Sequence, residues 1–249
     1  MRGHSLLYLF FFLLACTSCS VKEDRSECPC ILSLYTSDAA GKTVGVEVWN
    51  TGGVCVARGE TDATLLELKV PRGHLKVTAW SGLADCRLLG GVVSIPRGGQ
   101  MDELCAWRSE ADCSGEQASL ILFLHKQWAT VNLKLENYPF PQALPDLKIR
   151  GAVNGYDLAS GLPVEGGFLF SPPFSGEGDI VFRLPRQHGG ELLLEVGPKV
   201  LAIGDMIVRS GYDWEEPDLD DIYIWVDYLK STVKIGISDW NEVAYEENF

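Results

Sequence analysis

The sequence predicts an all-β protein built from β-sandwiches. Short runs of residues alternate between apolar and polar side chains with a period of two, which is the pattern of a half-buried strand. The 26 glycines and 12 prolines fall mostly between these runs, and strands about 8 to 12 residues apart with turn residues between them are typical of sandwiches. No window of helical length keeps apolar residues at the 3.6-residue spacing of a helix. A single large barrel is the alternative architecture.

Three alternating runs predict strands in the first half of the chain. Apolar residues occupy every second position of residues 44–49, 66–70 and 75–79. Residues 71–73, Pro-Arg-Gly, separate the last two runs and predict a turn, because proline presets the backbone for a turn and glycine accepts conformations that other residues avoid. The last two runs are therefore expected to follow each other through a tight connection.

The second half carries the clearest hairpin. An alternating run at 222–228 is followed by a turn at 229–232 and by a second alternating run at 233–237. A period of two that persists over about sixteen residues is the strongest strand signal that a single sequence offers. Three further strands are predicted, at residues 131–136, 180–184 and 192–196.

Residues 1–18 are predicted to be a signal peptide. Arg2 supplies the positive start, and Leu6–Leu14 is an unbroken apolar run. Nine residues in a helix span about 14 Å, roughly half of the ~30 Å hydrocarbon layer, so the run is too short to anchor the mature chain. A buried core helix is the alternative, but it would need polar residues at regular intervals. We therefore expect the segment to be removed.

The end of this segment has the form of a bacterial lipobox, with a cysteine after small residues. Cys16 has the better local match, with Leu13 at −3 and Ala15 at −1. Cysteine parity favours Cys19, because its lipidation leaves six cysteines that can all pair. Residues 19–27 then form a charged spacer like the surface-export tags of some Gram-negative lipoproteins. We predict lipidation at Cys19, with Cys16 as the alternative, and firm anchoring by more than one acyl chain.

The cysteines that remain all lie in the first half of the chain: Cys28, Cys30, Cys55, Cys86, Cys105 and Cys113. In an exported chain they predict a disulfide framework whose pairing the sequence does not choose. A zinc site typically has paired C-x-x-C spacing, which these cysteines lack, so no metal site is predicted. The lack of cysteine after residue 114 predicts two sandwich domains, residues 28–114 and 115–249, with a junction in the polar stretch 109–117.

Charge and motifs restrict the function further. The formal net charge of −13 leaves no broad basic surface for phosphates, so nucleic acid is not expected as a partner. The four histidines are far apart, which excludes a His-Glu-x-x-His metalloprotease helix. The chain has no G-x-S-x-G elbow and no phosphate-binding loop, so we predict no enzyme activity and no cofactor. A carboxylate pair for glycoside hydrolysis stays open, because carboxylate separation is a property of the fold.

Two features near the C-terminus are candidate binding devices. Tyr212 and Trp214 are predicted to lie in a loop, where aromatic rings stack on sugars or anchor a partner; core packing is the alternative. The acidic stretch 213–221 lacks the oxygen spacing of a calcium loop and predicts a solvated loop instead. The acidic tail 242–249 follows the last predicted strand, and we expect it to protect that strand's edge.

Three segments together resemble the FimB-like anchor lipoproteins of type V pili. The first is the charged stretch from Cys19 to Cys30, ending in Cys-Pro-Cys. The second, residues 73–82, is similar to the strand that closes the first sandwich of that family. The third and most specific comprises residues 218–228 and 233–240, which resemble the family's final hairpin and terminal tryptophan.

The resemblance implies two tandem transthyretin-like β-sandwich domains. It also implies a position at the base of a pilus, where the protein holds the shaft to the outer membrane and helps to end assembly. The implied partners are pilin subunits, which are joined by β-strand addition. Some relatives are placed at pilus tips or have no assigned role, so a carbohydrate-binding or adhesive surface lipoprotein is the alternative. The six cysteines are a departure from the family pattern.

Overall fold

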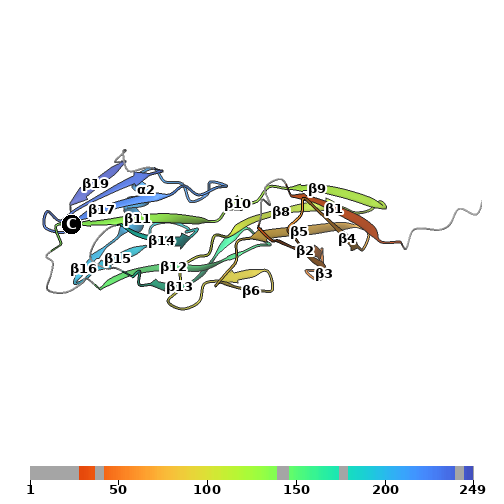
Figure 1. Ribbon diagram of the computed structural model, residues 1–249, viewed down its shortest axis with the longest axis horizontal. Helices are drawn as coiled ribbons and strands as arrows, with labels where there is room; N and C mark the ends of the chain where they lie inside the picture. The colour runs from red at the N-terminus through yellow and green to blue at the C-terminus, as the bar shows by residue number, and fades with distance from the viewer. Residues whose placement is uncertain (1–27, 37–41, 139–145, 174–178, 239–243, 249) are drawn as a thin grey trace, which may run out of the picture.

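A computed structural model describes residues 28–36, 42–138, 146–173, 179–238 and 244–248. The described chain is almost entirely β-strand, with one short helix, so the all-β prediction is confirmed. Its strands form four separate sheets rather than one closed barrel. Figure 1 shows an elongated molecule in which the first described strand and the last one lie toward opposite ends.

Two sheets build the N-terminal part of the molecule. The smaller has the strand order β4-β1-β9, with β9 parallel to β1, and the larger has the order β10-β8-β5-β2-β3 and is antiparallel throughout. The strands are β1 (Cys30–Thr36), β2 (Val44–Asn50), β3 (Cys55–Thr61), β4 (Leu65–Val70), β5 (His74–Ser81), β8 (Cys105–Asp112), β9 (Gln117–Leu122) and β10 (His125–Lys126).

Two further sheets build the C-terminal part. One has the order β14-β11-β17-β18-β19, and the other has the order β16-β15-β12-β7-β6, with β13 also paired to β12. Their elements are β6 (Arg87–Leu89), β7 (Val92–Ser94), β11 (Trp128–Glu136), β12 (Leu147–Asp157), β13 (Leu162–Phe170), β14 (Ile180–Pro185), β15 (Leu193–Val196), β16 (Lys199–Leu201), α2 (Ile203–Arg209), β17 (Ile222–Asp227), β18 (Thr232–Ile237) and β19 (Tyr245–Asn248).

The buried hydrophobic residues form two clusters. The first core consists of alternate residues of β1, β2 and β5 together with Val70, Ala111, Cys113 and Leu122. The second core is larger and includes the buried aromatic residues of the molecule: Tyr156, Phe168, Phe170, Phe182, Tyr212 and Trp214. The alternation of apolar residues along the strands explains both clusters, because every second side chain of a strand points to the same face of the sheet.

The two cores do not divide the chain at residue 114. Val93 and Leu104 belong to the second core, whereas Leu122, further along the chain, belongs to the first. The polar stretch 109–117 is the end of β8 and the turn into β9, which pairs with β1. The chain therefore passes between the cores more than once: into the second core by Val93 on β7, back to the first along β8, and into the second again after β9. The division into two domains itself stays a prediction.

The predicted strands are all present, and the predicted hairpin is β17 with β18. Its register places Ile224 opposite Ile235. The helix α2 was not predicted, because its seven residues are too few for a periodic window. Its buried residues Ile203, Met206 and Ile207 do have the i, i+3, i+4 spacing of a helix face.

The acidic tail contains a strand of its own. Residues Tyr245–Asn248 form β19 and pair antiparallel with β18. Glu246 forms an ion pair with Lys234, and Glu247 with Arg209 of α2. The tail therefore covers the edge of β18 with an acidic strand, as its composition led us to expect. Within the described residues, no helix has the length and apolar character needed to cross a membrane.

Candidate functional site

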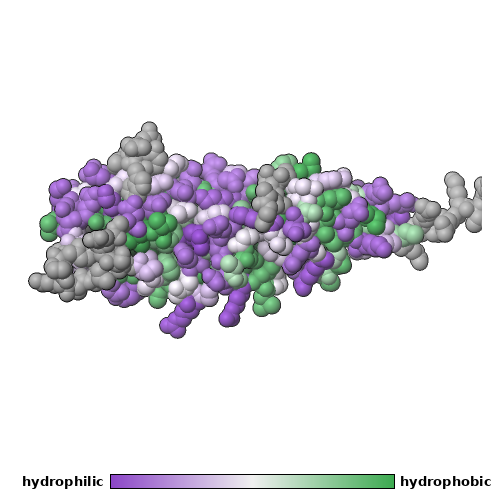
Figure 2. Space-filling model, viewed as in Figure 1, coloured by the Kyte–Doolittle hydropathy of each residue, from purple (hydrophilic) through white to green (hydrophobic). Residues whose placement is uncertain are grey.

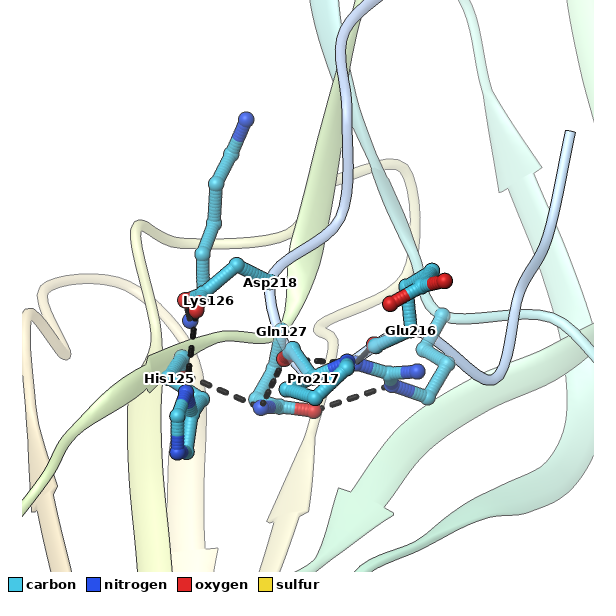
Figure 3. Close-up of polar contacts among 7 residues, drawn as sticks. His125, Lys126, Gln127, Glu216, Pro217 and Asp218 are labelled. Carbon is cyan, nitrogen blue, oxygen red and sulfur yellow. Dashed lines mark hydrogen bonds and ion pairs between the residues drawn. The ribbon is translucent and has the colours of Figure 1, made fainter.

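A cluster of polar residues joins β10, which lies near the middle of the molecule (Figure 1), to the acidic loop 213–221; Figure 3 shows its contacts. The Asp218 carboxylate accepts a hydrogen bond from the Lys126 backbone N–H at 2.7 Å and lies 2.9 Å from His125 Nδ1. Burial alone would raise the pKa of Asp218, but the bonds from His125 and Lys126 outweigh it and hold the pKa below its usual range. The carboxylate therefore stays ionised and fixes the loop against the strand.

Arg186 is the centre of this cluster. It directly follows β14 and is buried, with 8% of its surface exposed. Its guanidinium donates hydrogen bonds to Gln127 Oε1 at 2.9 Å, to the Glu216 carbonyl at 2.8 Å and to the Trp214 carbonyl. Burial lowers the pKa of Arg186, yet a guanidinium stays charged at neutral pH. One fixed cation thus satisfies several carbonyls of the loop, whose Leu219 N–H also donates to the Lys126 carbonyl of β10 at 3.3 Å.

The acidic stretch 213–221 is a loop in which Asp213, Glu215, Glu216, Asp218 and Asp220 are exposed, in line with the prediction of a solvated loop, while polar contacts hold it against β10. Asp221 Oδ1 lies 2.6 Å from Lys126 Nζ and also accepts from the Thr130 N–H at 3.3 Å. Leu219 between these acids is buried in the second core. Within the described ranges, no group of three or more acidic, histidine or cysteine residues is arranged to hold a metal ion.

The His125–Asp218 pair resembles the base half of a hydrolase triad, but its surroundings do not complete one. The adjacent hollow has a volume of about 320 Å³ and is lined by no described serine, threonine or cysteine. Cys105 lies opposite Lys126 on the neighbouring strand, and burial raises the pKa of its thiol, the reverse of what a nucleophile needs. We call this cluster the polar joint, because its hydrogen bonds hold the loop against β10.

The two predicted ligand-contact residues are buried instead. Tyr212 is 6% exposed and Trp214 5%, and their rings meet edge to face with centroids 4.7 Å apart. The Tyr212 hydroxyl donates to the Asp220 carbonyl at 2.8 Å, and burial raises its pKa. Neither ring presents a face to a sugar, so the alternative of core packing is the one that the structure has. The fixed loop backbone at Arg186 explains their burial.

The described cysteines are free thiols in this structure. Cys30 and Cys113 are buried, Cys55, Cys86 and Cys105 are half-buried, and Cys28 is exposed. The predicted disulfide framework is not formed here. The two candidate lipidation positions, Cys16 and Cys19, lie outside the described residues, so lipidation stays a prediction.

A hollow of about 820 Å³ lies between the middle of β12 and β13 and the turn after β14. The register of β12 against β13 shifts twice near Val153, and such bulges open a sheet locally. Its polar lining comprises Glu165, Gln187, His188 and Glu191, beside glycine backbone. His188 lies in the turn that borders this hollow.

One row of exposed hydrophobic residues crosses the β4-β1-β9 sheet. Tyr35 lies opposite Leu65 on β4 and Ile121 on β9, and the exposed fractions of Leu65, Tyr35 and Ile121 are 41%, 47% and 53%. Phe123 follows β9 and is 52% exposed. Figure 2 shows hydrophobic surface over this sheet. Because β9 is the outer strand of its sheet, this row ends at a strand edge.

Solved structures share this arrangement of strands. No protein-family model matches the sequence, and no curated protein matches it either. The fimbrial anchor protein Mfa2 from Porphyromonas gingivalis is 13% identical with a TM-score of 0.64, over 88% of this chain and 100% of that one. A candidate polysaccharide-binding protein from Bacteroides thetaiotaomicron is 12% identical with a TM-score of 0.60, over 88% and 98%.

A candidate adhesin from Bacteroides ovatus is 13% identical with a TM-score of 0.60, over 86% of this chain and 95% of that one. At these identities the likeness concerns the fold. The chain is thus similar, over almost the full length of each neighbour, to β-sandwich proteins described as a fimbrial anchor, a polysaccharide binder and an adhesin.

Proposed function

We propose that this protein is a cell-surface lipoprotein that anchors or caps a fimbria, a type V pilus, on the outer membrane and contributes to pilus assembly through β-strand contacts with pilin subunits. The observation that carries the proposal is the fold, which is similar to that of a fimbrial anchor protein over 88% of the chain. The lipobox-like sequence at Cys19 supports a tethered N-terminus.

The first described strand lies toward one end of the molecule (Figure 1), close in sequence to the segment that is predicted to carry the lipid. Strand β1, which follows the predicted lipid and spacer, lies toward one end of the elongated molecule, and β19 lies at the other end (Figure 1). A diacylated or triacylated cysteine holds a protein to a membrane far more firmly than a single chain does. A subunit tethered in this way cannot move along the shaft and serves as a terminus.

Of two strand edges, that of β9 is better suited to strand addition than that of β18. The edge of β18 is covered by the acidic strand β19, which disfavours pairing with another chain. Strand β9 is the outer strand of its sheet and carries the exposed residue Ile121. An added strand would extend the β4-β1-β9 sheet beyond β9, where its own side chains would pack beside Ile121.

Gene deletion tests the anchoring function. We expect a deletion strain to release fimbriae into the medium or to make fimbriae of altered length, and expression of the wild-type chain to restore attachment. Attached fimbriae of unchanged length in the deletion strain would refute the proposal.

A charge at the strand edge tests the mode of contact. Ile121→Asp is expected to reduce binding of the pilin subunit, because an edge charge opposes strand pairing. Leu89→Asp is the matched control, since Leu89 is 83% exposed and lies on β6 in a different sheet. Equal pilin binding by the two variants would remove β9 from the contact.

A carbohydrate-binding or adhesive function is the second candidate. The hollow of about 820 Å³ beside His188 has polar lining residues, and hydroxyl-rich ligands need such donors and acceptors. A glycan array with the wild-type chain tests this function. Comparing glycan binding by Glu191→Gln with that by the control Glu116→Gln tests whether the hollow is the binding site. A blank array, or binding that Glu191→Gln leaves intact, would exclude a sugar site there.

A further inference from the structure

Two buried cysteines face each other across the first core. Cys30 is the first residue of β1, in the small sheet, and Cys113 directly follows β8, in the larger one. Each has an exposed fraction of 0%, and both belong to the first core. Among the described residues no other two cysteines share a core: Cys86 packs against the second.

Backbone pairing holds these two residues at the same end of the sandwich. Cys30 pairs with Val70 at the end of β4, and the Cys113 N–H donates to the Gly73 carbonyl at 2.8 Å. Val70 and Gly73 flank the short turn between the two sheets. From the other side, the Ile31 N–H donates to the Glu116 carbonyl at 2.9 Å. Residues on both flanks thus hold the two cysteines next to each other, close enough for Cys30 to contribute to the raised pKa of Cys113.

We propose that Cys30 and Cys113 form a disulfide that joins the two sheets of the first core in the exported protein. Cys28, Cys55, Cys86 and Cys105 remain thiols. Cys55 has a different partner, since its Sγ accepts a hydrogen bond from Arg58 Nε at 3.3 Å. The inference requires only that the chain folds in an oxidising compartment, and it holds whether or not the protein anchors a fimbria.

The oxidation is a thiol–disulfide exchange with an oxidised protein dithiol of the exporting compartment. The thiolate of one cysteine attacks the carrier disulfide and forms a mixed disulfide, and the second thiolate displaces the carrier. One S–S bond forms and one breaks, and the two protons and two electrons pass to the carrier as two thiols. Burial raises the pKa of Cys113 to about 12, so the closed core holds little thiolate, and the exchange precedes closure of the core.

The first core is small, so the proposed disulfide would help to stabilise it. Its 13 buried hydrophobic residues compare with 32 in the second core, and small cores in exported proteins are commonly reinforced by disulfides. The bridge closes a loop of 113 − 30 = 83 positions, and long loops restrict the unfolded chain most. It also ties β1, the strand next to the N-terminal segment, to β8 by a covalent bond.

Peptide mapping of the wild-type chain tests the proposal directly. The chain is exported with its own leader, isolated from the cell envelope, alkylated in denaturant without reductant and digested. We expect one linked peptide pair containing Cys30 and Cys113, and alkylated Cys28, Cys55, Cys86 and Cys105. Alkylated Cys30 and Cys113, or either of them linked to a different cysteine, would overturn the proposal.

Thermal unfolding supplies a second readout on the same sequence. The chain made in a reducing cytosol is expected to unfold about 10 °C lower than the exported chain, because it lacks the cross-link. Cys30→Ala with Cys113→Ala should lower the Tm of the exported chain to that of the cytosolic one, whereas Cys55→Ala with Cys105→Ala should leave the difference in place. Equal Tm values for the exported and the cytosolic wild-type chains would contradict the bridge.

Discussion

The two cores of the molecule are stabilised in different ways. The first is small, contains no buried aromatic residue among those that the structure describes, and holds two buried cysteines where its two sheets meet. The second is larger and aromatic, and it gains contacts from α2, from the loop around Trp214 and from strands of both halves of the sequence. An elongated protein can thus combine a small core, for which we propose a cross-link, with one that buries many more hydrophobic side chains.

The largest loss is expected at the polar joint beside the second core. Arg186→Ala should reduce the free energy of unfolding by about 3 kcal/mol, because several loop carbonyls and Gln127 lose a buried donor. Urea denaturation measures the change. Arg108→Ala is the control, since the Arg108 side chain is exposed and its guanidinium bonds the Ala159 carbonyl at 3.4 Å, and it should change stability by less than about 0.5 kcal/mol. Equal losses of unfolding free energy in the two variants would show that Arg186 stabilises the fold no more than an exposed arginine does.

A smaller loss of unfolding free energy tests whether β7, from the first half of the sequence, belongs to the sheet of β12 beside the second core. A Cβ at Gly155 on β12 would lie 2.2 Å from the Val93 carbonyl of β7, so one strand must move. Gly155→Ala should therefore cost about 2 kcal/mol of unfolding free energy. At Gly167 on β13 a Cβ meets no atom within 4 Å, so Gly167→Ala is the matched control. A neutral Gly155→Ala would remove β7 from that sheet.

The smallest effect concerns the pH dependence of the hairpin β17–β18. Asp227 accepts a hydrogen bond from the Lys230 N–H at 3.0 Å and one from Asn137 Nδ2 at 2.9 Å, and the Lys230 N–H contributes most to lowering its pKa to about 2. Because the folded pKa lies below the unfolded value of about 3.9, the stabilisation is complete above about pH 4 and fades toward pH 2. Asp227→Asn should thus lower the Tm at pH 6, and the difference should shrink as the pH falls toward 2. A Tm difference that stays constant from pH 6 to pH 2 would contradict the assignment of this stabilisation to the ionised Asp227 carboxylate.

The sequence predicts strands well where one face is buried and the period of two is unbroken. The hairpin of β17 and β18 is the best example. Strand β12 escaped prediction because its register shifts on both sides of Val153, which interrupts the alternation. The membership of β7 in the second core depends on long-range pairing with β12, and no local pattern encodes such a pairing.

The candidate site was harder to predict than the fold. Tyr212 and Trp214 lie in a loop, as expected, but the loop is docked because Arg186 satisfies its carbonyls. A single arginine after an apolar strand is the only signal of that role in the sequence. Pairing of Cys30 with Cys113 likewise depends on two sheets meeting at one turn, which spacing along the chain does not reveal.

The measurement that tests the central proposal most directly is the distribution of fimbriae between cells and medium in a strain that carries Cys19→Ala. Loss of the lipid should release fimbriae together with this protein, while Cys16→Ala, which alters only the predicted leader, should leave them on the cells. Fimbriae that stay attached at the wild-type level in the Cys19→Ala strain would contradict the proposal that this chain is their lipid-tethered anchor.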